Sequence, residues 1–355
     1  MSERTNGHDD RLRVVVAGTA FGRIYLDAVL SDPAFSLAGI LARGGDFSRE
    51  CAARHDVPLF TSVDEVPGDV HLACVVVSSG ALGGPGSMLA QDFLRRGIHV
   101  LQEHPVHAEE IADCLRAARA GGAAYAVNTL YPRLRPVRQF LAAARALRLE
   151  FADAACNSQV AYPLLDILGR LAGTLRPWRF GDVAKGSGPF QSLHAEIGGL
   201  PVTLRVQNQV HPDDPDNHSH LLHRITTGGE AGVLALADTH GPVLWSPRLH
   251  APRDRTGRLI MTGSAMPSTV MLGDPPGTHR DVFATLWPDA VARSLHSLRR
   301  DIADPARRAR SGQWALGVSL AWRDLTSRIG LPELIDPPEP QAIPIEELTT
   351  KVGEV

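Results

Sequence analysis

Two side chains that can transfer a proton follow apolar segments of this sequence. The strand predicted at 99–102 is followed by Glu103-His104-Pro105, and the strand predicted at 124–128 is followed by Tyr131. Because the carboxyl ends of neighbouring parallel strands meet at one edge of a sheet, where ligands bind, we expect His104 and Tyr131 to lie together beside a crevice. Pro105 restricts the backbone of His104 to extended conformations and so helps to fix the imidazole.

The chemistry that this pair favours is the reduction of a C=N bond. Such a reduction adds a hydride to carbon and a proton to nitrogen, and an imidazole, with an ordinary pKa of about 6.5, can supply that proton near neutral pH. Tyr131 can donate a hydrogen bond or relay the proton. The alternative is a structural role, in which His104 satisfies a buried carbonyl group and Tyr131 packs between two domains.

The turn after the first predicted strand, at 13–17, is a candidate dinucleotide site. A GxGxxG fingerprint would place glycines at 18, 20 and 23, and the chain reads Gly-Thr-Ala-Phe-Gly-Arg over 18–23, which is a degenerate match. A glycine at 18 can make the tight turn, and an alanine at 20 is small enough for the backbone to approach a pyrophosphate at the helix N-terminus. The alternative is the strand–turn–helix of any α/β protein. The predicted cofactor contacts here are Gly18, Thr19, Ala20, Phe21 and Gly22.

The end of the second predicted strand favours NADPH over NADH. The acidic residue that usually binds the adenosine ribose lies about 20 residues beyond the fingerprint, and here that place is Ala42-Arg43. A guanidinium suits a 2′-phosphate, and Ser48 and Arg49 at the next helix are further predicted ligands. The alternative is that these arginines are solvated and that Asp46 serves NAD. The remaining predicted cofactor contacts are Ser78, Ser79 and Glu103.

Short apolar segments alternate with helical ones along the chain, which indicates an α/β fold. In the first part, strands predicted at 13–17, 36–42, 58–60, 72–78, 99–102 and 124–128 form a doubly wound parallel Rossmann sheet, with Ser48 and Ser87 as helix N-caps. In the second part, strands predicted at 151–157, 190–197, 202–209, 221–226, 233–237 and 243–245 form a large open, mainly antiparallel sheet. Helices predicted at 281–301 and 305–329 follow.

A chain of 355 residues is too long for one ordinary core, so two domains are expected. The free face of an open apolar sheet needs a cover, and we expect a homodimer through that face. The predicted organisation is a disordered tail at 1–11, an NADP-binding Rossmann domain at 12–130, a substrate and dimerisation α/β domain at 131–335 and a C-terminal tail at 336–355.

Composition and charge restrict the partners. A net charge of -3 gives no electrostatic reason to expect nucleic acid or an anionic membrane surface. The four cysteines lack CxxC spacing and are typical of reduced thiols in the cytoplasm. The polar start of the chain does not resemble a signal peptide, and no apolar run approaches the ~18 residues of a membrane span. We therefore expect a cytoplasmic protein.

Two charged segments suggest other sites. The histidines and aspartates at 211–223 could indicate a metal site, but Pro212 and Pro215 predict a polar turn, and zinc ligands seldom come from so loose a cluster without cysteines. No metal is predicted. The arginines between 299 and 310 could contact an acidic partner, although a solvated helix face is the more common explanation.

Several motifs resemble a known family. The strand–turn–helix, the tripeptide Glu103-His104-Pro105 and Tyr131 resemble the Gfo/Idh/MocA oxidoreductases, whose fold is a Rossmann domain followed by an open-sheet α/β domain. Most of that family has a lysine where this chain has His104. That departure, together with the stretches AGTAFGRIYLDAVL, GGPGSMLAQDFLRRGIHVLQEHPVH, NTLYP, YPLLDILGRL and HPDDPDNHSHLLHR, closely resembles the thiazolinyl imine reductases of siderophore biosynthesis over about residues 12–330.

The resemblance implies an activity and its residues. NADPH would reduce a thiazoline ring to a thiazolidine on an intermediate tethered to a carrier domain of a nonribosomal peptide synthetase, with His104 and Tyr131 matching the general acids. Two alternatives are an NADP-dependent sugar or polyol dehydrogenase of the same superfamily and a catalytically silent NADP-binding regulator. Asp166 matches an aspartate of sugar-oxidising relatives, but Arg170 stands where they have histidine. The missing lysine and histidine weaken the dehydrogenase hypothesis.

Overall fold

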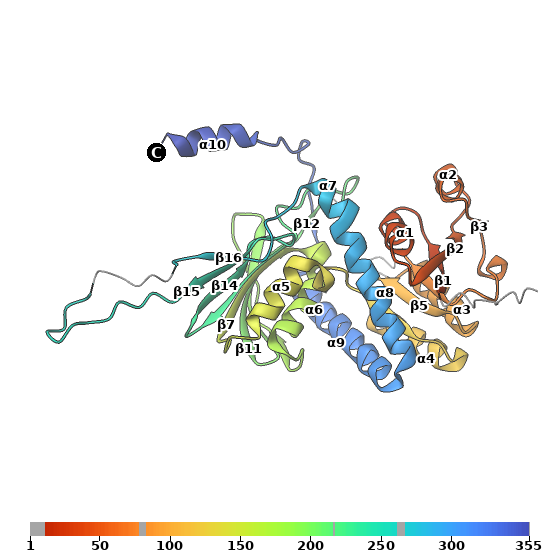
Figure 1. The fold of residues 1–355 in the computed structure, drawn as a ribbon, viewed down its shortest axis with the longest axis horizontal. Helices are drawn as coiled ribbons and strands as arrows, with labels where there is room; N and C mark the ends of the chain where they lie inside the picture. Colours follow the sequence, from red (N-terminus) through yellow and green to blue (C-terminus); the bar gives the residue numbers. More distant parts are fainter. Residues whose placement is uncertain (1–10, 78–82, 216, 261–266, 355) are drawn as a thin grey trace, which may run out of the picture.

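The computed structural model describes residues 11–77, 83–215, 217–260 and 267–354, which form two α/β units side by side (Figure 1). Apart from Arg11, the tail predicted at 1–11 lies outside the described residues, and so do Ser78 and Ser79. No helix within these ranges is both long and apolar enough to cross a lipid bilayer.

The first unit contains a parallel sheet of six strands in the order β3-β2-β1-β4-β5-β6, which is the Rossmann order. Apolar runs such as Val14–Ala17 and Leu72–Val75 are buried because helices cover both faces of the sheet. The predicted doubly wound sheet is confirmed. Its elements are β1 (Leu12–Ala17), α1 (Gly22–Ser31), β2 (Phe35–Leu41), α2 (Asp46–Arg54), β3 (Leu59–Phe60), η1 (Val63–Glu65), β4 (Leu72–Val75), α3 (Pro85–Arg95), β5 (His99–Glu103), α4 (Ala108–Gly121) and β6 (Tyr125–Asn128).

Two helices of this unit begin earlier than the sequence suggested. The N-cap of α2 is Gly45 and that of α3 is Gly84, so the prediction that Ser48 and Ser87 are N-caps is wrong. Both serines lie in the first helical turn and are buried. In α3 the cause is Pro85, whose fixed φ suits the first helical position and starts the helix upstream of the serine.

The second unit contains a nine-stranded sheet with the order β16-β15-β14-β13-β7-β11-β10-β8, in which β9 also pairs with β10. Strands β7 and β11 are parallel neighbours, and the other pairs are antiparallel. The predicted large, mainly antiparallel sheet is confirmed. Its strands are β7 (Phe151–Asn157), β8 (Trp178–Phe180), β9 (Ala184–Lys185), β10 (Phe190–Ile197), β11 (Leu200–Gln207), β13 (His223–Gly229), β14 (Gly232–Leu236), β15 (Val243–Pro247) and β16 (Val270–Leu272), and a separate pair joins β12 (Gln209–Val210) to β17 (Glu333–Leu334).

Helices cover one face of this sheet and leave the other open (Figure 1). The covered face packs buried residues such as Leu204 and Ile225 against α5 (Arg135–Ala144), α6 (Ala161–Ala172) and α9 (Pro305–Ile329). The open face presents exposed charged side chains, namely Asp153, Arg205 and Arg224. This face is therefore polar, contrary to the apolar free face that the sequence suggested, because the strands alternate apolar and polar residues. The homodimer stays a prediction.

Helix α8 (Trp287–Ala303) lies between the two units (Figure 1). It continues from α7 (His279–Asp281) through one π-helical turn, η4 (Val282–Leu286), and packs on α1. Ser294 donates a hydrogen bond to Asn128 Oδ1 at 2.8 Å, and His296 Nε2 lies 2.7 Å from a carboxylate oxygen of Asp32. The segment predicted as a C-terminal tail contains the exposed helix α10 (Ile345–Gly353).

Candidate active site

His104 directly follows β5, and two acceptors fix its ring. Nδ1 lies 2.8 Å from Glu103 Oε1 and 3.1 Å from the carbonyl oxygen of Asn128, which also accepts the backbone N–H of His104. Since both neighbours of Nδ1 are acceptors, Nδ1 carries a proton. Nε2 is therefore the nitrogen that remains for proton exchange with a ligand.

A buried network holds the carboxylate of Glu103. Tyr25 of α1 donates a hydrogen bond to Glu103 Oε2, and Asn128 Nδ2 donates to the same oxygen at 3.1 Å and to Tyr25 Oη at 2.6 Å. Burial, with the charge of Glu103 adding to it, raises the pKa of Tyr25 well above its ordinary value, so Tyr25 stays a donor. The structure thus places Glu103 against His104. Its predicted contact with a cofactor stays a prediction.

Tyr131 opens the 3₁₀ turn η2 (Tyr131–Arg133) after β6 and faces His104. The two ring centroids are 6.0 Å apart, with the planes at 74°. The phenol ring also lies 4.8 Å from the ring of His223 and 6.2 Å from that of Trp287, and the residue is 7% exposed. The two proton donors predicted from the sequence therefore converge at the carboxyl ends of β5 and β6.

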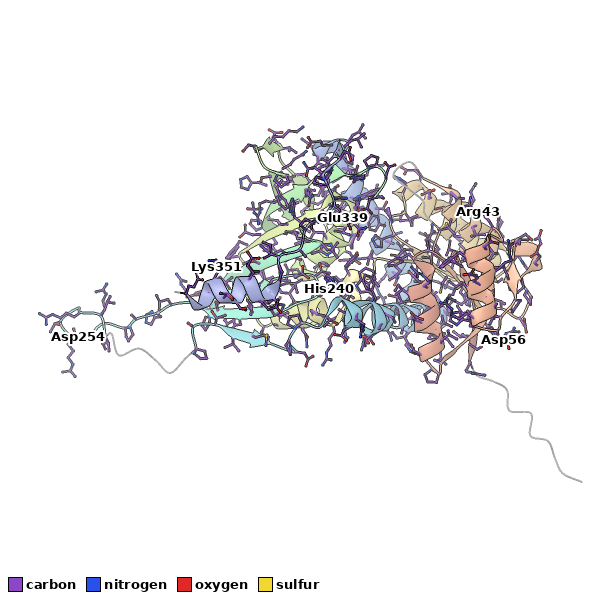
Figure 2. The ribbon with its side chains drawn as sticks, turned by 90° about the horizontal axis from the view of Figure 1, so that it is seen from above. Arg43, Asp56, His240, Asp254, Glu339 and Lys351 are labelled. Carbon is purple, nitrogen blue, oxygen red and sulfur yellow. The ribbon has the colours of Figure 1, made fainter. Side chains whose placement is uncertain are left out.

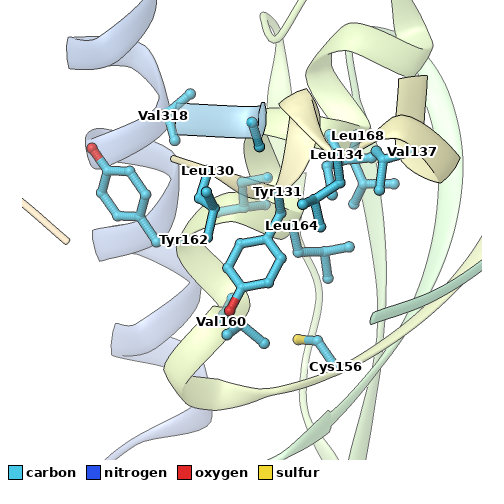
Figure 3. Packing of buried hydrophobic residues seen from close by; sticks show 14 of the residues in the cluster. Leu130, Tyr131, Leu134, Val137, Cys156, Val160, Tyr162, Leu164, Leu168 and Val318 are labelled. Carbon is cyan, nitrogen blue, oxygen red and sulfur yellow. The ribbon is translucent and has the colours of Figure 1, made fainter. Parts of the chain in front are cut away.

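Tyr162 of α6 packs against His104 as well. Its ring stacks on the imidazole at a centroid distance of 5.9 Å and an angle of 28°. Figure 3 shows that the hydroxyl of Tyr131 points toward Val160, whereas the hydroxyl of Tyr162 lies on the side of α9. Burial raises the pKa of Tyr162, so its phenol stays protonated. Of the two tyrosines beside His104, Tyr131 directs its hydroxyl to the side away from α9.

His223 belongs to this region and comes from the histidine-rich segment 211–223, whose pattern had suggested a metal site. It is the first residue of β13 and is completely buried. Its Nε2 donates to the carbonyl oxygen of Val160 at 2.9 Å, and its Nδ1 lies 3.1 Å from Thr239 Oγ1. Burial lowers the pKa of His223 to about 4, so the ring is neutral near neutral pH. An uncharged imidazole ring therefore packs beside Tyr131.

Trp287, at the start of α8, links the predicted cofactor turn to the catalytic candidates. Its ring lies 5.5 Å from that of Phe21 and 6.2 Å from that of Tyr131. The indole Nε1 donates to His240 Nε2 at 3.1 Å, and Figure 2 shows His240 beside the start of α8. The sequence did not indicate Trp287 or His240, because contacts over such separations leave no local pattern.

The turn between β1 and α1 fits a dinucleotide. Gly18 has φ +98°, and a Cβ there would lie 2.4 Å from the carbonyl oxygen of Val76, so only glycine is accommodated. Within the described part of the chain, no side chain caps the N-terminus of α1 and its first turn has no acidic residue. The first N–H groups of α1 are thus suited to a pyrophosphate. The predicted contacts that lie on this turn are Gly18, Thr19, Ala20, Phe21 and Gly22.

The predicted ligands of a 2′-phosphate lie near the end of β2, but they are not equally placed. Arg43 is exposed on the outer side of the first unit (Figure 2). The guanidinium of Arg49 is 2.6 Å from a carboxylate oxygen of Asp46. Ser48 is buried, and its hydroxyl donates to the carbonyl of Gly45 at 2.7 Å. Arg43 is therefore the best placed of the three for a phosphate.

Asp166 is buried in α6 and has several hydrogen-bond donors. Thr129 Oγ1 donates to one carboxylate oxygen, and Arg170 Nε and Trp314 Nε1 donate to the other at 2.7 Å each. Burial alone would raise the pKa of Asp166, but the charge of Arg170 and these hydrogen bonds lower it below the ordinary value. Asp166 is therefore an ionised residue paired with Arg170 rather than with a histidine.

Two histidines of the segment 211–223 each lie close to a different carboxylate. The rings of His211 and His218 stack at 4.7 Å, and they lie 3.3 Å and 3.4 Å from oxygens of Asp336 and Asp214 respectively. His220 precedes β13 rather than lying in it. Among the residues that the structure describes, no group of three or more metal-ligating side chains could hold an ion.

Three features together define an NAD(P)-dependent oxidoreductase. They are the Rossmann sheet, the turn before α1 that requires glycine, and the pair of proton donors at neighbouring strand ends. Matches to family models indicate the type of oxidoreductase. Residues 12–129 match the oxidoreductase family with an NAD-binding Rossmann fold, Gfo/Idh/MocA, and residues 148–246 match the model "Thiazolinyl imine reductase Irp3-like, C-terminal". The first unit thus matches the Gfo/Idh/MocA oxidoreductases and the second matches the Irp3-like C-terminal domain, which confirms the resemblance seen in the sequence.

Solved structures of similar fold bind NAD or NADP. GenD2 from gentamicin A biosynthesis, in complex with NAD, is 15% identical with a TM-score of 0.61, and the match covers 93% of this chain and 97% of that one. An oxidoreductase from Agrobacterium radiobacter, in complex with NAD+, L-tartaric acid and magnesium, is 9% identical with a TM-score of 0.68, covering 90% and 96%. KijD10, a 3-ketoreductase from Actinomadura kijaniata in complex with TDP-benzene and NADP, is 14% identical with a TM-score of 0.65, covering 92% and 100%. Such identities show the fold alone. A comparison with curated proteins found no match.

Proposed function

We propose that this protein uses NADPH to reduce the C=N bond of a thiazoline ring to a thiazolidine, on an intermediate tethered to a carrier domain of a nonribosomal peptide synthetase in siderophore biosynthesis. The observation that carries the proposal is the convergence of His104 and Tyr131 beside the dinucleotide turn, in a chain whose C-terminal domain is of the Irp3-like type. A cytoplasmic location and a homodimer belong to the same proposal.

His104 acts as the proton donor to the ring nitrogen. When NADPH is bound, it supplies the hydride that adds to the ring carbon, so the C=N bond becomes CH–NH after one proton reaches nitrogen. With Nδ1 held by Glu103 and Asn128, protonated His104 presents that proton on Nε2. Tyr131 hydrogen-bonds the substrate or relays the proton, and solvent restores the proton of His104 afterwards.

The cofactor in this proposal is NADPH rather than NADH. The preference for NADPH rests on Arg43, because its exposed guanidinium stands where an acidic residue would bind the ribose of NADH. Asp46, the alternative partner of a ribose hydroxyl, is paired with Arg49. That pairing leaves the region with a cation that suits the 2′-phosphate.

The test is a pair of substitutions at the proposed proton donors. His104→Ala should lower kcat for a thiazoline at least a hundredfold, because general acid catalysis typically contributes 10²–10⁴-fold. Tyr131→Phe removes only the hydroxyl and should lower kcat about tenfold. NADPH consumption measures the rate, and NADPH binding should change less than about threefold in both variants. The matched control is His194→Ala, on the open face of the second sheet.

Each outcome has a consequence. Turnover of His104→Ala at the wild-type rate would remove His104 from the mechanism. Oxidation of free sugars or polyols with NADP, without turnover of a thiazoline, would favour the dehydrogenase hypothesis. Tight NADPH binding without turnover of any imine, free or carrier-bound, would instead favour the silent regulator.

A further inference from the structure

A cavity lies beside the candidate active site. It has a volume of about 790 Å³ and is bounded by β6, at the edge of the first sheet, and by α6, α8 and α9. Asn128 and Thr129 line it, but neither His104 nor Tyr131 does. Its charged lining residues are Arg133, Arg145, Asp166, Arg170, Asp301, Arg307 and Arg310.

Two guanidinium groups in this cavity donate hydrogen bonds to the same neutral oxygen. Arg133 donates a hydrogen bond to Ser297 Oγ at 3.1 Å, and Arg307 donates to the same oxygen at 3.0 Å. A hydroxyl oxygen carries no charge to balance two cations. Like charges this close repel each other, and the repulsion grows where water is excluded.

The two carboxylates of the cavity pair with only two of its five arginines. Asp166 is engaged by Arg170, Thr129 and Trp314. Asp301 Oδ1 forms an ion pair with Arg307 Nε at 2.6 Å, although the N–H is not aligned with the oxygen. The cavity therefore has an excess of positive charge.

Arg133 is a largely buried cation of the cavity that no carboxylate in the described structure pairs with directly. Among the described residues, no carboxylate oxygen is within salt-bridge distance of its guanidinium. Burial, followed by the charge of Arg170, lowers the pKa of Arg133 to about 10, against the attraction of Asp166. A bound anion between Arg133 and Arg307 would remove the repulsion and satisfy the remaining N–H groups.

We propose that this cavity binds a small molecule through a phosphate or carboxylate group, which Arg133 and Arg307 hold beside Ser297. The exposed Arg145, together with Arg310, gives the mouth the same sign of charge. The volume exceeds what a lone inorganic anion fills and is in the range of pockets for metabolite-sized ligands. Arg133 and Tyr131 share the turn η2, so the ligand contacts the same turn that holds the candidate proton donor.

The experiment measures anion binding to the full chain by calorimetry and by thermal unfolding. The probes are inorganic phosphate and citrate, each titrated in the absence of cofactor and again with saturating NADPH. Both should raise the unfolding temperature of the wild type, because a ligand of the folded state stabilises it. Tighter binding of phosphate assigns a phosphate ester as the ligand, and tighter binding of citrate assigns a carboxylate.

Three variants locate the site. Arg133→Met should weaken anion binding at least tenfold, because it removes a charged hydrogen-bond donor to the anion. Arg310→Met should weaken it severalfold, because it removes positive charge from the mouth of the cavity. Arg299→Met is the matched control on α8, since Arg299 is exposed and does not line the cavity. If Arg133→Met fails to fold, Arg310→Met together with Ser297→Ala gives the same information.

Several results would overturn the proposal. One is that neither anion binds the wild type at millimolar concentration. Another is that Arg299→Met weakens binding as much as Arg310→Met does, which would indicate general surface charge. A third is that saturating NADPH abolishes phosphate binding, which would place the anion in the cofactor site. Anion binding that persists in saturating NADPH and is weakened by Arg310→Met supports a binding site in the cavity.

Discussion

The neutral, buried His223 makes a quantitative prediction about stability. Its pKa is about 4 in the folded protein, against an ordinary value of 6.5 in the unfolded chain. Above pH 6.5 the ring is neutral in both states and contributes nothing to the pH dependence. As the pH falls from 6.5 to about 4, the unfolded state binds the proton first, so stability decreases over this window.

The size of the effect follows from the shift. The difference between 6.5 and about 4 corresponds to about 3 kcal/mol at about 1.36 kcal/mol per pKa unit. About 1.4 kcal/mol of it should already be lost at about pH 5.5, where most aspartates and glutamates are still ionised. His223→Gln removes the titrating group and retains an N–H donor for the carbonyl of Val160.

The assay is urea unfolding of the wild type and of His223→Gln at about pH 7.5 and pH 5.5. Other histidines titrate in both proteins, so the difference between the two pH dependences isolates His223. We expect the wild type to lose about 1.4 kcal/mol more than the variant between these pH values. Equal losses would show that His223 is not held neutral by burial and would refute the reasoning.

Three further substitutions test the candidate site. Glu103→Gln should lower kcat about tenfold or more and change its pH profile with little effect on NADPH binding, because the carboxylate fixes the tautomer of His104; Glu109→Gln, on the surface, is its control. Gly18→Ala should weaken NADPH binding at least tenfold, since the added Cβ would lie 2.4 Å from a carbonyl oxygen, whereas Gly68→Ala meets open space and should have no effect. Arg43→Ala should weaken the binding of NADPH about tenfold and leave that of NADH unchanged, and equal effects on both would contradict the assignment of the 2′-phosphate.

Local patterns in the sequence predicted much of the fold. The strands at Phe151–Asn157 and Phe190–Ile197 were predicted with the bounds that they have, because each is an apolar or alternating run between turn residues. The short edge strands β8, β9 and β16 were missed, since two or three residues carry no periodicity. The start of α2 at Asp46 was missed because serine is a common N-cap and the structure uses Gly45 instead.

What the sequence by itself determined is the position of His104 and Tyr131 at neighbouring strand ends. A parallel Rossmann sheet has only one edge where such ends can meet, so strand order alone brought the two residues together. Only the tertiary structure decided what surrounds them. Tyr25, His223 and Trp287 reach the site from three distant segments by packing of side chains, and the meeting of Arg133 with Arg307 depends on the docking of α8 and α9. Contacts of this kind are set by the geometry of the whole core and leave no trace in the local pattern of residues.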